Sequence, residues 1–210
     1  WKTSIKKQSI KSMSLLIESI KVIDGRYFNL FYHEQRMIRS LETLCGYDGD
    51  FNLEQFLSAF HPPSPGVFKC RLVYDDVSRE VEFIPYEMKA IGSLKIVENN
   101  RIKYEFKYTN RKAIEKLYAR RENCDDVLIV RKGKVTDSSF SNIVFRRGNT
   151  WVTPWSPLLR GTMRQNLIDS NRIQTEDIGI NEIHSFQSFK LINALLEFEG
   201  PEIDVSRIVF

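Results

Sequence analysis

The sequence predicts an α+β fold divided into two small parts. Segments with the two-residue alternation of strands are interleaved with segments whose apolar residues recur at helical spacing. Turn signals separate the strand-like segments, which favours sheets built largely from neighbouring strands. The 210 residues, of which 42% are hydrophobic, suffice for one large core or two small ones. We expect a domain boundary near residue 100.

The first part, residues 1–100, is predicted to be an antiparallel sheet with one helical layer. Its first strand ends at Asp24-Gly25, a hairpin turn signal, and a proline-rich break at 62–66 ends its helical layer. Residues 1–12 are interpreted as a possible extension ahead of the folded body. The expected strands are 15–22, 26–31, FKCRLVYD (68–75), EVEFIPYE (80–87) and SLKIV (93–97), and the expected helices are 33–44 and 53–60.

The second part, residues 101–210, is predicted to mix hairpins with helices. Lys132-Gly133-Lys134 and Arg147-Gly148-Asn149 mark two hairpin turns. Pro154 and Pro157 break the chain before a helix that begins near Gly161-Thr162. The remaining expected segments are a strand at 103–106, a helix at 111–121, strands at 126–130, 142–145, 150–152 and 207–210, and a buried run at 189–196.

Composition excludes several classes of protein. The charge of +4 is spread along the chain, and the basic N-terminal stretch has no interleaved aromatic residues, so we expect no nucleic-acid partner. The three cysteines and three histidines are scattered without metal-ligand spacing, so we expect neither a metal site nor a disulfide framework. No apolar run reaches the ~20 residues that cross a bilayer, and no apolar segment typical of a signal peptide follows the basic N-terminus. We therefore expect an intracellular, cytoplasmic protein.

Four short runs contain residues that can carry chemistry. In YEFKYTNRKAIEKLY, Lys107 has apolar neighbours at the predicted end of a strand, where desolvation would favour the neutral amine that Schiff-base formation requires. In VTDSSFSNIVF, Asp137 could pair with a protonated pyridine nitrogen. In RGTMRQ, Gly161 and Thr162 open a helix whose free amides could bind a phosphate. In HEQR, Arg36 could supply a second phosphate contact.

Each run taken singly also has an ordinary structural explanation. Lys107 could be a solvated surface lysine, Asp137 a backbone cap in a polar turn, Gly161-Thr162 a simple helix cap, and Arg36 the partner in a surface ion pair. The combination of the four carries more information than any one.

Together the runs resemble the class-IV aminotransferases, the fold-type-IV enzymes that depend on pyridoxal 5'-phosphate (PLP). The resemblance covers about 16–196 in the order ESIKVIDG, HEQRM, KYTNR, VTDSSFSNIVF, RGTMRQ and LINALL. It implies two small α/β domains with the cofactor at their junction, a homodimer and a small-molecule substrate.

The resemblance also implies residue roles. Lys107 would form the Schiff base with PLP and act as acid and base. The other cofactor-binding residues would be Arg36, Asp137, Asn142, Gly161 and Thr162, and Asn193 would line the substrate side. The sequence departs from the family pattern at Asp137, which is usually glutamate, and at Arg111, where aminotransferases usually have tyrosine.

KYTNR, GTMRQ and INALL are more similar to the 4-amino-4-deoxychorismate lyases of this family, which form 4-aminobenzoate and pyruvate in folate biosynthesis. We therefore expect a lyase of this type, with Arg71 and Arg111 as candidates for binding the substrate carboxylates. The alternatives are a branched-chain or D-amino-acid aminotransferase with the same lysine, and a non-catalytic relative that keeps the fold.

Overall fold

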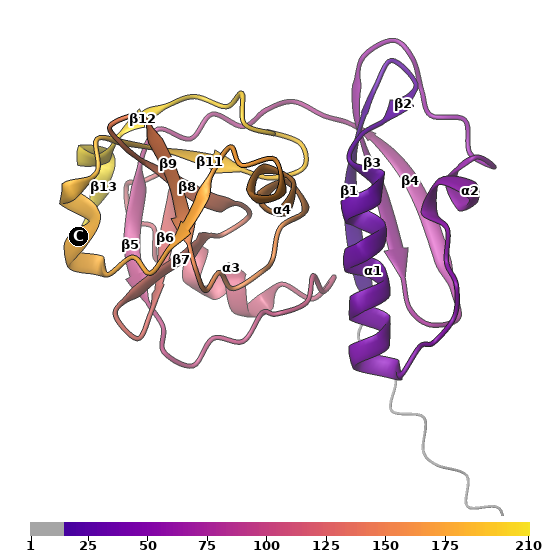
Figure 1. Ribbon diagram of the computed structural model, residues 1–210, viewed down its shortest axis with the longest axis horizontal. Helices are drawn as coiled ribbons and strands as arrows, with labels where there is room; N and C mark the ends of the chain where they lie inside the picture. Colours follow the sequence, from indigo (N-terminus) through magenta and orange to yellow (C-terminus); the bar gives the residue numbers. More distant parts are fainter. Residues whose placement is uncertain (1–14) are drawn as a thin grey trace, which may run out of the picture.

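The computed structural model describes residues 15–210, so the predicted extension at 1–12 lies outside the described residues. These residues form two β-sheets with a few short helices, and the two sheets with their helices lie side by side (Figure 1). The α+β fold class predicted from the sequence is confirmed. No helix within the described range is long and apolar enough to cross a membrane.

The first sheet has four antiparallel strands in the order β2-β1-β3-β4. Burial alternates strictly along β1, because successive side chains of a strand point to opposite faces. Asp24 and Gly25 both have positive φ, of 46° and 79°, as a tight hairpin turn requires. The strands are β1 (Leu16–Ile23), β2 (Arg26–Tyr27), β3 (Val67–Tyr74) and β4 (Arg79–Pro85).

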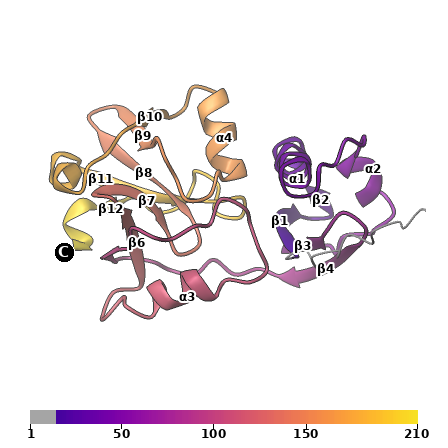
Figure 2. The same ribbon diagram turned by 90° about the horizontal axis from the view of Figure 1, so that it is seen from below.

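Helices α1 (Leu30–Cys45) and α2 (Leu53–Leu57) cover one face of this sheet (Figure 2). Their apolar side chains close a core with the inward residues of β1 and β3. The buried members of this core are Leu16, Ile20, Val22, Met37, Leu41, Leu53, Leu57, Cys70, Leu72 and Tyr74. Gly46 ends α1 with a φ of 69°, a conformation in which a side chain would be strained.

The second sheet has the order β10-β9-β8-β7-β6-β5-β13, with β11 paired to β8 and β12. Three pairs are parallel, β5 with β6, β13 with β5 and β10 with β9. The strands are β5 (Leu94–Glu98), β6 (Asp126–Arg131), β7 (Lys134–Ser138), β8 (Asn142–Arg147), β9 (Thr150–Pro154), β10 (Gln174–Glu176), β11 (Ser188–Ile192), β12 (Ile203–Asp204) and β13 (Ile208–Val209). The helical segments are α3 (Lys112–Tyr118), α4 (Thr162–Asp169), η1 (Ile180–Ser185) and η2 (Val205–Arg207).

Four expected elements differ from the structure. The strand expected at 26–31 ends at Tyr27, because Leu30 already starts the amphipathic α1 after Asn29. The helix expected at 53–60 ends at Leu57, and residues 58–60 form turns that lead to the proline-rich break at 62–66. The strand at 93–97 pairs in parallel with β6 of the second sheet rather than with the first sheet.

The fourth difference concerns the segment that contains Lys107. Residues 103–106 form no strand, and the chain instead follows the free edge of β1. The Ile17 amide donates to the Lys107 carbonyl at 2.9 Å, and the Thr109 amide donates to the Leu15 carbonyl at 2.9 Å. β2 is too short to cover this part of β1, so its backbone groups find partners in the incoming segment. Two backbone hydrogen bonds therefore hold Lys107 against the first sheet.

Candidate active site

A cavity of about 310 Å³ lies between the two sheets and is lined by residues of both. This volume is in the range of small-molecule sites. Eight of the nine predicted site residues line it, namely Arg36, Lys107, Arg111, Asp137, Asn142, Gly161, Thr162 and Asn193. Arg71 does not line the cavity. Its guanidinium lies 3.5 Å from the Glu82 carboxylate, and both side chains are partly exposed to solvent.

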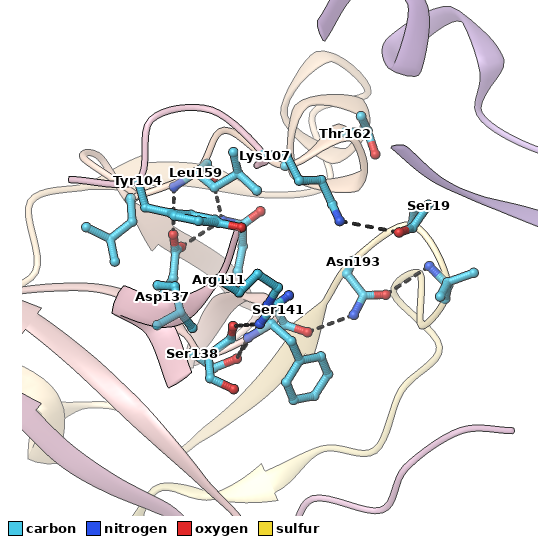
Figure 3. A pocket seen from close by; sticks show the side chains of 18 of the residues that line it. Ser19, Tyr104, Lys107, Arg111, Asp137, Ser138, Ser141, Leu159, Thr162 and Asn193 are labelled. Carbon is cyan, nitrogen blue, oxygen red and sulfur yellow. Dashed lines mark hydrogen bonds between the residues drawn. The ribbon is translucent and has the colours of Figure 1, made fainter. Parts of the chain in front are cut away.

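Lys107 points into the cavity toward Ser19 (Figure 3), and its Nζ lies 3.3 Å from Ser19 Oγ. Burial lowers the pKa of Lys107 to about 7, and the positive charges of Arg36, Arg111 and Lys69 add to this effect against the opposing charge of Glu18. A large share of Lys107 is therefore neutral near pH 7, as a nucleophilic amine must be.

Arg36 is held by a buried carboxylate that sequence reasoning missed. Glu18 is fully buried and accepts the Arg36 Nε–H at 2.9 Å and a second hydrogen bond from Arg36 Nη2. His33 Nδ1 lies 2.6 Å from the same carboxylate. Burial by itself would raise the pKa of Glu18, but Arg36 and His33 outweigh it and lower that pKa to about 2. The guanidinium is thus fixed from behind while Arg36 faces the cavity.

Asp137 lies on β7 at the opposite sheet, buried to 5% exposure. One carboxylate oxygen accepts from Asn142 Nδ2 at 2.7 Å and the other from the Leu159 amide at 2.9 Å. Burial raises the pKa of Asp137 to about 6 in spite of these two donors. Leu159 is distant in sequence, so Asp137 is not a local turn cap.

Gly161 and Thr162 begin α4 beside Asn142. A Cβ on Gly161 would come within 2.0 Å of Asn142 Oδ1, so the close approach allows only glycine. No side chain caps the helix N-terminus, and Thr162 is buried in the cavity wall. Together with Arg36, which lines the same cavity from α1, these donors fit an anionic phosphate group.

Two further predicted residues are tied to the turn that follows β7. Arg111 Nη2 donates to the Ser139 carbonyl at 2.7 Å. Asn193 Nδ2 donates to Ser141 Oγ at 2.8 Å, while its Oδ1 accepts the Leu195 amide at 2.8 Å (Figure 3). The turn at 138–141 thus fixes one cationic and one amide side chain in the cavity.

The cavity also contains residues that the sequence reasoning did not single out. Ser19 and Lys69 come from the first sheet, and three aromatic rings, Tyr86, Tyr104 and Phe140, belong to the lining. The rings add flat apolar surface beside the charged groups. The cavity therefore combines an amine of lowered pKa, a buried acid of raised pKa, a helix N-terminus without a side-chain cap and three aromatic rings.

Fold and cavity together define an α+β protein with a buried lysine of lowered pKa in the cavity between its two sheets, and sequence comparison gives its family. The profile of the amino-transferase class IV family matches residues 77–199. The chain belongs to this family, whose enzymes depend on PLP.

Individual relatives agree with this assignment. An uncharacterized protein of Haemophilus influenzae is 34% identical over 182 residues, covering 86% of this chain and 97% of the relative. A crystal structure from Haemophilus somnus, of a protein proposed to be a 4-amino-4-deoxychorismate lyase, superposes with a TM-score of 0.81 at 32% identity over 87% of this chain and 96% of that one. A Schizosaccharomyces pombe protein, proposed to be an aminodeoxychorismate lyase, is 36% identical over 81 residues, 35% of each chain. The fold-type-IV architecture expected from the sequence is confirmed by this structural match.

Proposed function

We propose that this enzyme is a PLP-dependent 4-amino-4-deoxychorismate lyase, which forms 4-aminobenzoate and pyruvate and so supplies folate biosynthesis. The observation that carries the proposal is Lys107, whose amine of lowered pKa faces a cavity that also holds Asp137 and Arg111. Similarity to two proteins proposed to be lyases supports the reaction. The presence of Arg111 in place of the usual aminotransferase tyrosine supports it further.

The residues around the cavity fit PLP. Lys107 would hold the cofactor through Nζ, and the Asp137 carboxylate would face the pyridine nitrogen. Arg36 and the first turn of α4 at Gly161 and Thr162 would bind the phosphate. Asn142 would keep Asp137 in place, because its Nδ2 donates to the Asp137 carboxylate and also to the Leu159 carbonyl at 2.8 Å.

Bound PLP supplies an electron sink that stabilises negative charge on a substrate carbon. The chain supplies positioning and proton transfer. The Lys107 amine, neutral in large part near pH 7 because its pKa is about 7, can take a proton from the substrate and return one where pyruvate leaves. Asn193 would orient the substrate from the opposite wall, and the rings of Tyr86, Tyr104 and Phe140 suit a cyclic substrate that becomes aromatic.

The test begins with the absorbance spectrum of the purified protein with added PLP. We expect a visible band near ~400 nm that borohydride reduces to a stable adduct on Lys107, found by peptide mapping. Lys107→Ala should lose the adduct and at least about 10³-fold in turnover, whereas Lys134→Ala, a surface variant, should keep both. A reduced adduct on another lysine would overturn the assignment of Lys107.

The reaction is tested by incubating the PLP-loaded protein with aminodeoxychorismate and, separately, with simple amino acids and a keto acid. Formation of 4-aminobenzoate and pyruvate supports the lyase. Amino transfer from branched-chain or D-amino acids, without 4-aminobenzoate, would show that the chain is an aminotransferase with the same lysine.

We also propose a homodimer in the cytoplasm. Phe31 at the start of α1 is 63% exposed and packs edge-on against Tyr32, with ring centroids 5.2 Å apart, an apolar surface that a second subunit could cover. No disulfide joins the cysteines of the described residues, as suits a reducing compartment. Light scattering tests the dimer, and a purely monomeric PLP-loaded protein would contradict it.

A further inference from the structure

The charged groups around the cavity are strongly unbalanced in sign. Within the described residues, one carboxylate faces five cationic side chains across this space. The acid is Asp137, and the cations are Arg36, Lys69, Lys89, Lys107 and Arg111. A pocket lined mostly by one sign of charge concentrates ligands of the opposite sign.

Three of these cations already have a partner or a role. Arg36 is neutralised by the buried Glu18 carboxylate. Lys107 is the reactive amine of the proposed function. Lys89, at the exposed rim, has its Nζ 3.2 Å from the Tyr118 hydroxyl and 5.4 Å from the centre of that ring.

Once Arg36, the exposed Lys89 and Lys107 are set aside, Lys69 and Arg111 remain, and neither is paired with an acid within residues 15–210. Arg111 is anchored by a neutral carbonyl, that of Ser139, so its positive charge is not compensated. Across residues 15–210, the Lys69 side chain takes part in no hydrogen bond and no ion pair, although it is half-buried. A half-buried ammonium without a counter-charge costs free energy, which an anionic ligand would recover.

Lys69 reaches the cavity because of its register on β3. It lies opposite Lys21 on β1 and opposite Ile84 on β4, on the face of the sheet that also presents Ser19, the hydrogen-bond partner of Lys107. Arg71, two residues further along, shares this face but lies against Glu82. The cations Lys69 and Arg111 are both close enough to Lys107 for their charges to depress its pKa.

We propose that Lys69, together with Arg111, forms an anion-binding subsite that takes the second carboxylate of a dicarboxylate substrate. The inference rests on the proposed function, since aminodeoxychorismate carries one carboxylate on its ring and one on its enolpyruvyl ether. It makes Lys69 a specificity-determining residue, because an ordinary amino acid with one carboxylate has nothing to place there.

Two ring compounds that differ by one carboxylate test the subsite. The dianion 3-(carboxymethoxy)benzoate and the monoanion 3-methoxybenzoate are titrated into the PLP-loaded protein by calorimetry. We expect the wild type to bind the dianion at least about tenfold more tightly. Lys69→Met should weaken the dianion roughly five- to tenfold and the monoanion less than about twofold. Lys69→Arg should keep the preference, and Lys134→Met, which removes a surface lysine paired with Asp177, should change neither affinity.

Several results would overturn the subsite. The subsite is overturned if the wild type binds the two compounds equally. It is also overturned if Lys69→Met keeps the dianion preference while Arg71→Met loses it. Thermal unfolding of each variant shows whether it is folded, and Lys69→Gln replaces Lys69→Met if the latter is not. The visible band and the Lys107 adduct are recorded on the same preparations. Their absence counts against the proposed function, whereas their presence without dianion preference counts against the subsite alone.

Discussion

Glu18 and Asp137 are two buried carboxylates on opposite sides of the same cavity, with exposed fractions of 0% and 5%. Their pKa values move in opposite directions, to about 2 for Glu18 and to about 6 for Asp137. Glu18 is hydrogen-bonded to a guanidinium and an imidazole, whereas Asp137 accepts hydrogen bonds from an amide side chain and a backbone amide and has the charge of Arg164 only nearby. Burial is nearly equal, so the partners decide the sign of the shift.

The difference separates two tasks in the site. The first sheet presents a charge pair that is complete within the protein, with Glu18 fixing the arginine that faces the cavity. The second sheet presents an acid whose hydrogen-bond donors are neutral. The nearby Arg164 charge lowers the pKa of Asp137 less than burial raises it, so the carboxylate can still pair with a cationic group of a ligand. A positively charged pyridine nitrogen would give the Asp137 carboxylate a counter-charge, as Arg36 does for Glu18.

Removing the charge of Glu18 should have the largest effect on folding. Glu18→Gln leaves the Arg36 guanidinium without its counter-charge, and we expect the free energy of unfolding to fall by about 3 kcal/mol, as when one partner of a buried pair is lost. Urea unfolding without PLP measures it. The double variant Glu18→Gln/Arg36→Met removes both charges and should recover part of the loss. If Glu18→Gln lowered the free energy of unfolding by less than about 1 kcal/mol, Glu18 would not be the main counter-charge of Arg36.

The same pair predicts how stability depends on pH. The pKa of Glu18 lies below its usual 4.5 at about 2 in the folded protein, so its contribution is fully present above pH 4.5 and is lost as the pH falls toward 2. The stability gap between wild type and Glu18→Gln should therefore shrink across this window. A gap that stays constant from pH 5 to pH 2.5 would contradict the charge pairing.

Asp137→Asn tests whether the charge of Asp137 serves the reaction rather than the stability of the fold. We expect little more than about 1 kcal/mol of change in stability but roughly a 100-fold loss of turnover, because asparagine keeps the shape and cannot carry charge opposite the pyridine nitrogen. Asp126→Asn is the matched control. Asp126 is also fully buried in the second sheet with a raised pKa, but it does not line the cavity. Equal losses of turnover in the two variants would show that Asp137 acts only through folding.

Much of the fold could be predicted, because strand alternation and helical spacing are local properties. Sheet membership is not local: the sequence predicts the strand at Leu94–Glu98 in the first sheet, whereas it pairs with β6 of the second. Its alternation is the same for a parallel or an antiparallel partner. Residues 103–106 have the composition of a strand but form none, and the segment meets β1 at a single bridge, between Tyr108 and Leu16.

Within the candidate site, short motifs identified the residues that face the cavity, whereas the residues that support them were missed. Glu18 did leave a signal. In LIESIKVI it occupies the same face as Leu16 and Ile20, where an acid must have a buried partner. His33 and Arg36 are three residues apart and so share one face of α1. Lys69 and Arg71 could not be separated from sequence, because both occupy the same face of β3 and only the contact with Glu82 distinguishes them.

Ser19 should show the smallest effect, although it adjoins Glu18 on β1 and contacts the reactive amine. Its hydroxyl is neutral and 3.3 Å from Lys107 Nζ, a long hydrogen bond that favours the charged amine only slightly. Ser19→Ala should therefore lower the pKa of Lys107 by less than about one pH unit and reduce turnover less than about threefold. The pH dependence of PLP uptake measures the first effect. The control is Ser141→Ala, because the Ser141 hydroxyl accepts a hydrogen bond from Asn193 and not from Lys107. It should leave the pH dependence of PLP uptake unchanged. If Ser19→Ala moved it by more than one pH unit, the amine would be tuned by a local hydrogen bond. If the change stays small, the pKa of Lys107 is set mainly by burial and by charged groups from both sides of the cavity.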